Sequence, residues 1–115
     1  MELLLHYVWK HKIFPLKMLR TTTGKPVEVI DAGLPNTNAG PDFFNAKLKI
    51  DGTLWVGNVE VHTVASDWMR HGHDKDVAYD NVILHVAETV DCEVFRANGA
   101  SVPPVSYTHL RAHET

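Results

Sequence analysis

Hydrophobic and polar positions follow a helical period at the start of the chain and a strand period farther along. Apolar residues between 2 and about 13 recur at helical spacing, which predicts a helix that Pro15 ends or bends. Residues 27–30 alternate as a half-buried strand does. Residues 32–41 lack periodicity and are rich in glycine, proline and asparagine, which predicts a long loop.

A β-hairpin is the strongest local signal. Asp51-Gly52 separates the apolar runs 46–50 and 54–62, and Asp-Gly favours a type I′ turn. Further strands are expected over 81–87 and 92–96, and Asn98-Gly99 indicates a second hairpin. The predicted fold class is therefore α+β, with an N-terminal helix packed on a mixed or antiparallel sheet. Trp55 is expected in the core, and Trp68 is expected in a lid over it.

Composition narrows the class of protein. The chain has 115 residues, enough for one domain, and its 44% hydrophobic and 22% charged content is that of a globular protein. No apolar run is long enough to span a bilayer, and we expect a cytoplasmic protein. The single cysteine, Cys92, excludes an internal disulfide and a cysteine-cluster zinc site. A metal would have to be held by oxygen and imidazole.

The C-terminal segment is predicted to differ in origin from the rest of the chain. Residues 105–115 read VSYTHLRAHET, which resembles the translation of a transposase-type sequencing adapter. We therefore expect a single domain over 1–104, which is the N-terminal part of a longer protein, followed by a non-native tail. His109 and His113 would then carry no function, and six histidines remain to be explained.

Candidate chemistry gathers on the predicted hairpin. Asp42 ends the long loop, and Glu60 and His62 share one face of the following strand because side chains alternate between faces. Two carboxylates can hold Mg²⁺ or Mn²⁺ by oxygen, and the cation lowers the pKa of a bound water. The plainer alternative is that Asp42 caps a turn and that Glu60 belongs to a solvated strand face.

The order Pro41-Asp42, strand, turn, strand, Glu60-x-His62 resembles the core of the PD-(D/E)xK nuclease superfamily. This resemblance implies a restriction-endonuclease-like core, here truncated, that hydrolyses DNA or RNA with Mg²⁺ or Mn²⁺. It assigns Asp42 and Glu60 as metal ligands, His62 as the third catalytic residue, and Glu2 as a further ligand on the preceding helix. His62 replaces the usual lysine, and the substantial helix expected after this strand is absent from the pattern.

Four runs of residues also resemble the bacterial family called domain of unknown function 2851. They are 38–46, 57–62, 67–76 and 82–86, and they cover nearly the whole of residues 1–104 in order. The resemblance implies a bacterial source and a longer parent protein whose missing C-terminal region is a candidate for substrate binding. It implies no activity.

The remaining histidines and the charge distribution leave two other hypotheses open. His71 and His73 have the spacing of a metal clip but also suit a structural loop. His85 is expected to be a core histidine, and the alternative is that it lies across the sheet from His62. A zinc hydrolase would use these four histidines. A non-catalytic nucleic-acid-binding or scaffold module would instead use residues 1–25, where five basic residues outnumber Glu2. Carboxylate ligands favour Mg²⁺ or Mn²⁺ and imidazole favours Zn²⁺, so metal preference separates the hypotheses.

Overall fold

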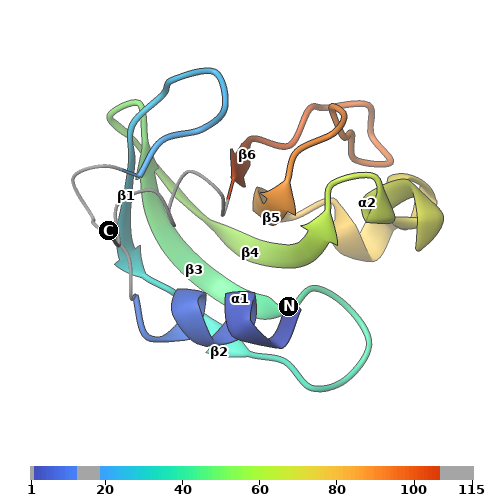
Figure 1. Ribbon diagram of the computed structural model, residues 1–115, viewed down its shortest axis with the longest axis horizontal. Coiled ribbons are helices and arrows are strands. Elements are labelled where there is room, and N and C mark those ends of the chain that lie inside the picture. Colours follow the sequence, from blue (N-terminus) through green and yellow to red (C-terminus); the bar gives the residue numbers. More distant parts are fainter. Residues whose placement is uncertain (1, 13–18, 107–115) are drawn as a thin grey trace.

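The computed structural model describes residues 2–12 and 19–106 of the chain (Figure 1). A nine-residue helix opens the chain, most of the remainder is sheet, and the predicted α+β class is confirmed. The elements are, in order, α1 (Glu2–Lys10), β1 (Val27–Asp31), β2 (Leu34–Pro35), β3 (Phe43–Ile50), β4 (Thr53–Val64), α2 (Asp67–Arg70), two 3₁₀ turns (His73–Lys75 and Val77–Tyr79), β5 (Val82–Thr89) and β6 (Pro104–Ser106).

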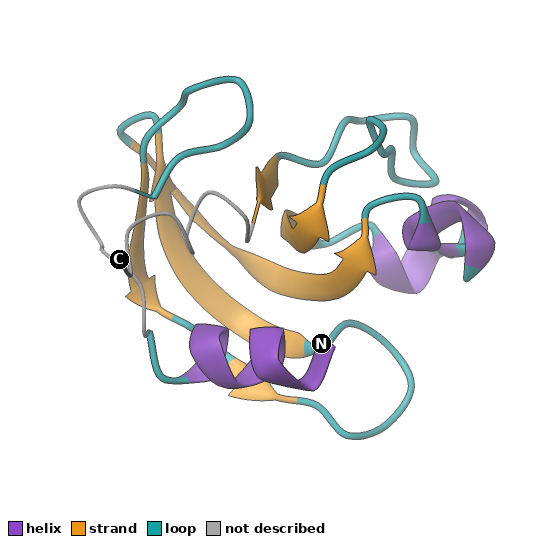
Figure 2. Ribbon diagram, viewed as in Figure 1, coloured by secondary structure: helices purple, strands orange, loops and turns teal. Residues whose placement is uncertain are grey.

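The strands form one mixed sheet, which α1 covers on one side (Figure 2). The order is β1-β3-β4-β5-β6, and the short strand β2 also pairs with β3. The pairs from β1 to β4 are antiparallel, whereas β4–β5 and β5–β6 are parallel. Parallel neighbours need a crossover, and the segment from α2 through the 3₁₀ turns supplies it between β4 and β5. The crossover therefore runs directly past the end of β4.

The hydrophobic core consists of two clusters of buried side chains. In the larger one Leu5, Val8 and Trp9 of α1 pack against the sheet, and the indole Nε1 of Trp9 donates a hydrogen bond of 2.9 Å to the carbonyl of Ala32. The smaller cluster lies around the crossover, where Trp68 is fully buried. These clusters fix the helix and the crossover on the sheet, and thereby the side chains that they carry.

The predicted hairpin is confirmed in its position and in its turn. Ile50 pairs with Thr53, so Asp51 and Gly52 form a two-residue loop, and their φ angles of 52° and 82° are both positive, as a type I′ turn requires. This tight turn sets the register of β4 against β3. The register in turn determines which residue of β4 faces Asp42.

Three of the sequence predictions are wrong. Residues 92–96 do not form a strand, since Phe95 makes only an isolated bridge with Ser101 while β6 occupies the sheet edge beside β5. Trp55 is 48% exposed, because the pairing of β4 with β5 begins only at Asn58 and the start of β4 projects beyond the buried clusters. Trp68 belongs to the core itself rather than to a lid.

The C-terminal end of the described region extends past the expected boundary of the fold. Val105 is buried and Ser106 pairs with Ala87, so these two residues belong to the sheet although the sequence placed them in the tail. Residues 107–115 and Pro15 lie outside the described residues. Among the helices that are described, none has the length and apolar character needed to cross a membrane.

Candidate functional site

The end of β4 brings the predicted pair of carboxyl groups together. Pairing of β3 with β4 stops at Phe43 and Val59, so β4 continues beyond its neighbour and Asp42 lies beside the open edge. The backbone N–H of Val61 donates a hydrogen bond of 2.8 Å to Asp42 Oδ2, and the N–H of Asp42 donates one of 3.1 Å to Glu60 Oε1. These two hydrogen bonds hold Asp42 against Glu60.

Glu60 contacts a different set of groups through its second oxygen. Its Oε2 atom lies 3.2 Å from His62 Nε2 and 2.8 Å from His73 Nε2. The Glu60 residue is only 4% exposed, although carboxyl groups are seldom buried without a partner. Glu60 therefore links Asp42 on one side to a group of imidazole rings on the other.

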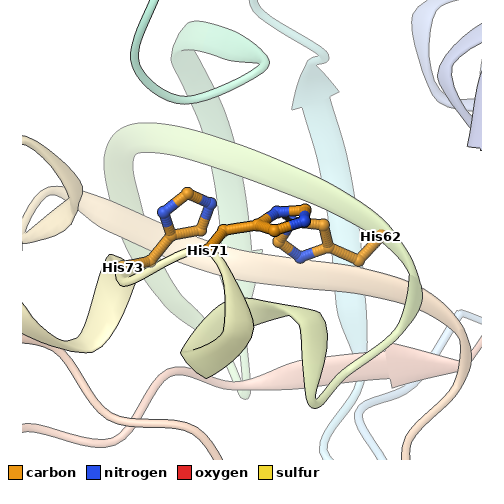
Figure 3. Close-up of side chains that lie close together, drawn as sticks. All are labelled: His62, His71 and His73. Atoms are coloured by element: carbon orange, nitrogen blue, oxygen red, sulfur yellow. Dashed lines mark hydrogen bonds between the residues drawn. The ribbon is translucent and has the colours of Figure 1, made fainter.

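Imidazole rings from two other segments of the chain converge on His62. His62 Nδ1 lies 2.8 Å from His85 Nε2 on the adjacent parallel strand, as expected for a histidine across the sheet. His71 Nδ1 lies 3.2 Å from His62 Nε2. Figure 3 shows His62, on β4, together with His71 and His73, from the turn that follows α2. Gly72 separates these two residues with a φ of 76°, a left-handed conformation that reverses the chain and turns both rings toward β4.

A second group of donors lies at the start of α1. Glu2 and His6 are one helical turn apart, with His6 Nε2 at 3.9 Å from Glu2 Oε1 and at 3.6 Å from Asp42 Oδ2. Glu2, His6 and Asp42 thus form one set of possible metal ligands, and His62, His71 and His73 form another; within each set the ligand atoms lie within 4.8 Å of one another. Sequence reasoning placed Glu2 here but missed His6, whose signal was its four-residue spacing from Glu2.

Burial controls the protonation of these groups. Burial first, and then the neighbouring Asp42 carboxyl group, raise the pKa of Glu60 to about 10. Burial first, and then neighbouring imidazoles, lower the pKa of His62 to about 3 and that of His85 to about 4. Burial also lowers the pKa of His73. In the metal-free protein at neutral pH, the contacts of Glu60 with His62 and His73 are therefore hydrogen bonds between neutral groups rather than ion pairs.

The site is buried rather than placed in an open cavity. Two of its polar atoms, Nδ1 of His73 and Nδ1 of His85, are buried and have no hydrogen-bond partner among the described residues. The ring of His73 stacks on that of Tyr79 at 3.6 Å between centroids, and Trp68 lies edge-on to it. A cavity of about 930 Å³ elsewhere is lined by residues such as Thr21, Trp55 and Arg96 and by none of the groups described above. We place the candidate chemistry at the buried cluster, because the titratable and ligating side chains converge there.

The arrangement offers two kinds of donor that could hold a divalent cation. Carboxyl oxygens from Asp42, Glu60 and Glu2 suit a hard cation, and neutral imidazole nitrogens suit a transition metal. Neutral imidazole is the form that binds metal, so the lowered pKa values of His62 and His73 keep these rings ready for ligation at neutral pH.

Comparison with known proteins gives a family and no activity. The family described as "Protein of unknown function (DUF2851)" matches residues 2–114. No curated protein and no solved structure matches the chain.

Proposed function

Because this chain belongs to the DUF2851 family of proteins of unknown function, its activity has to be argued from the site, and we propose that it is a metal-dependent hydrolase that cleaves phosphodiester bonds in DNA or RNA. One observation carries the proposal: Asp42 and Glu60 lie side by side at the open edge of β4, with His62 next to Glu60. The N–H of Asp42 donates a hydrogen bond to the Glu60 carboxyl group, and the N–H of Val61 donates one to the Asp42 carboxyl group. The chain order of helix, Pro41-Asp42 and a hairpin whose second strand carries Glu60-x-His62 supports the resemblance to the PD-(D/E)xK nucleases.

The donor set fits a divalent cation. A carboxyl group as buried as Glu60, set against a second carboxyl group, can ionise only if positive charge compensates for it. Asp42 and Glu60 would hold the ion, and Glu2, whose carboxyl lies near Asp42, would assist. When bound, Mg²⁺ or Mn²⁺ supplies a water of lowered pKa and neutralises charge that develops on the phosphate.

The protein side chains supply orientation. His62 is held by His85 through Nδ1, and its Nε2 faces Glu60. His62 would place the water by a hydrogen bond rather than take its proton, because burial lowers the pKa of His62 to about 3 and makes it a weak base at neutral pH. His6 lies beside Asp42 on the exposed side of the site, where an incoming phosphate would meet it.

Cleavage of labelled DNA and RNA by the full chain tests the proposal. We expect Mn²⁺-dependent cleavage by the wild-type protein that is lost in Glu60→Gln and Asp42→Asn. Glu28→Gln is the matched control, because Glu28 is an exposed glutamate on β1, and it should cleave as the wild type does. Circular dichroism confirms that each variant is folded. Absence of cleavage by a folded wild type, or cleavage that survives both site variants, would overturn the proposal.

The non-catalytic alternative makes a different prediction. A scaffold or nucleic-acid-binding module would bind DNA or RNA equally well with and without divalent cation, and neither Asp42→Asn nor Glu60→Gln would change that binding. The same samples, examined by fluorescence anisotropy, therefore separate the two functions.

A further inference from the structure

The ligand atoms of His62, His71 and His73 lie within 4.8 Å of one another, and Glu60 Oε2 lies close to the rings of His62 and His73. Four donor atoms follow one another at short distances: His71 Nδ1 to His62 Nε2 at 3.2 Å, His62 Nε2 to Glu60 Oε2 at 3.2 Å, and Glu60 Oε2 to His73 Nε2 at 2.8 Å. A tetrahedral Zn²⁺ with ligand bonds of about 2.0–2.1 Å separates its ligand atoms by about 3.3 Å. The two separations of 3.2 Å lie within about 0.2 Å of that edge, whereas the separation of 2.8 Å between Glu60 and His73 is about 0.5 Å shorter.

We propose that His62, His71 and His73 bind a transition-metal ion of the Zn²⁺ class, with the Glu60 carboxylate as the fourth ligand. This proposal goes beyond the proposed function, because with Zn²⁺ bound His62 Nε2 is a ligand rather than the group that places the water. One oxygen of Glu60 faces the imidazole rings and the other faces Asp42, so the two groups of donors share this carboxylate.

The choice of metal follows from the donors. Imidazole nitrogen binds Zn²⁺ and its neighbours far better than Mg²⁺, which prefers oxygen ligands and retains its waters. Three imidazoles and one carboxylate match the ligand number that Zn²⁺ takes in proteins. The backbone supports the same set, because Gly72 turns His71 and His73 toward a strand that already carries His62 and Glu60.

The surroundings of the ligands also suit a metal centre. A ligating histidine is usually oriented by a hydrogen bond to its other ring nitrogen, and His62 has this bond, from Nδ1 to Nε2 of His85. His73 is fixed instead by stacking on Tyr79. His62 and His73 are buried and His71 is exposed, so the site has a wall of packed side chains and an entry path for the ion at His71.

Titration of the full chain with Co²⁺ tests this site without any nucleic acid. Four-coordinate Co²⁺ absorbs visible light far more strongly than six-coordinate Co²⁺, and Zn²⁺ should displace it. His71→Ala removes a ligand at an exposed position, where the fold is least affected. Loss of an outer-shell partner alone weakens metal affinity by roughly 10- to 100-fold, so this variant should weaken binding by more than about 100-fold. His11→Ala replaces an exposed histidine at the end of α1 and should bind as the wild type does.

The possible results separate this proposal from the proposed function. A four-coordinate spectrum that His71→Ala abolishes, and that Asp42→Asn retains, supports the imidazole site even if the protein cleaves nothing. Mn²⁺-dependent cleavage without a four-coordinate Co²⁺ spectrum overturns the imidazole site and leaves the hydrolase standing. Binding that His71→Ala and His11→Ala weaken equally, or a six-coordinate spectrum in the wild type, likewise overturns it.

Discussion

Acid is expected to destabilise the metal-free protein through its buried histidines. Burial and neighbouring imidazoles lower the pKa of His62 from 6.5 to about 3 and that of His85 from 6.5 to about 4. Below pH 6.5 the unfolded chain therefore binds a proton at each of these residues that the native protein does not bind. Their contribution to stability is present above pH 6.5 and is lost as the pH falls toward the native pKa values.

Alkali is expected to destabilise the same protein through Glu60. Burial and the Asp42 carboxyl group raise the pKa of Glu60 from 4.5 to about 10, so above pH 4.5 the native protein keeps a proton that the unfolded chain has lost. Each such proton changes the free energy of unfolding by roughly 1.4 kcal/mol per pH unit. Above pH 6.5 the histidines no longer differ between the two states, and stability should decrease by about 1.4 kcal/mol per unit.

The two effects predict a maximum of stability near pH 6.5. Just below pH 6.5, unfolding takes up two protons at His62 and His85 and releases one from Glu60. This net uptake of one proton makes the free energy of unfolding decrease by roughly 1.4 kcal/mol for each unit by which the pH falls. The lowered pKa of His73 makes that slope steeper. A bound metal ion should remove the alkaline decrease, because it compensates for the ionised Glu60 carboxylate.

Urea denaturation in the presence of a chelator, at intervals between about pH 5 and 8.5, measures this profile directly. Glu60→Gln cannot ionise and should lose the alkaline decrease while it keeps the acid decrease. Stability that stays level or increases from pH 6.5 to about 8.5 in the wild type would refute the reasoning, because it would mean that Glu60 is ionised in the native protein without a cation.

Four further substitutions test the packing and the metal site. Trp68→Ala should lower the free energy of unfolding by about 3–5 kcal/mol because the ring is fully buried, whereas Trp55→Ala should change it by about 0.5 kcal/mol. Equal losses in urea denaturation would contradict the assignment of Trp68 to the core. Gly57→Ala should cost at least about 1–3 kcal/mol, because its Cβ would lie 2.6 Å from the carbonyl oxygen of Asn81; a wild-type melting temperature would be inconsistent with that contact. His85→Ala should weaken Zn²⁺ binding roughly 10- to 100-fold in calorimetry through the loss of its bond to His62, and an unchanged affinity would show that His85 does not orient that ligand.

Local patterns in the sequence predicted the parts of the fold that depend on neighbouring residues. The Asp51-Gly52 turn fixes a register, and with strand alternation it placed Glu60 and His62 on one face of β4. The helix at the N-terminus and β5 were predicted from periodicity in the same way. The strand expected over 92–96 failed because strand propensity depends on an available sheet edge, which β6 occupies in the structure.

The composition of the site depended on contacts that no local pattern contains. His6 approaches Asp42 only because α1 packs across the sheet at one particular position, a tertiary arrangement of residues far apart in the sequence. The spacing of His71 and His73 in the sequence is compatible both with a metal clip and with a structural loop. Their approach to His62 depends on the left-handed Gly72 and on the crossover packing around Trp68, which together turn the loop back onto β4.

The location of a bound Zn²⁺ ion tests the central claim most directly, and anomalous scattering from crystals of the zinc-loaded full chain would measure it. We predict an anomalous peak at about 2.0–2.1 Å from nitrogen atoms of His62, His71 and His73, with Glu60 Oε2 completing the coordination. A peak on other residues, or zinc-loaded crystals in which these three rings coordinate nothing, would contradict the account.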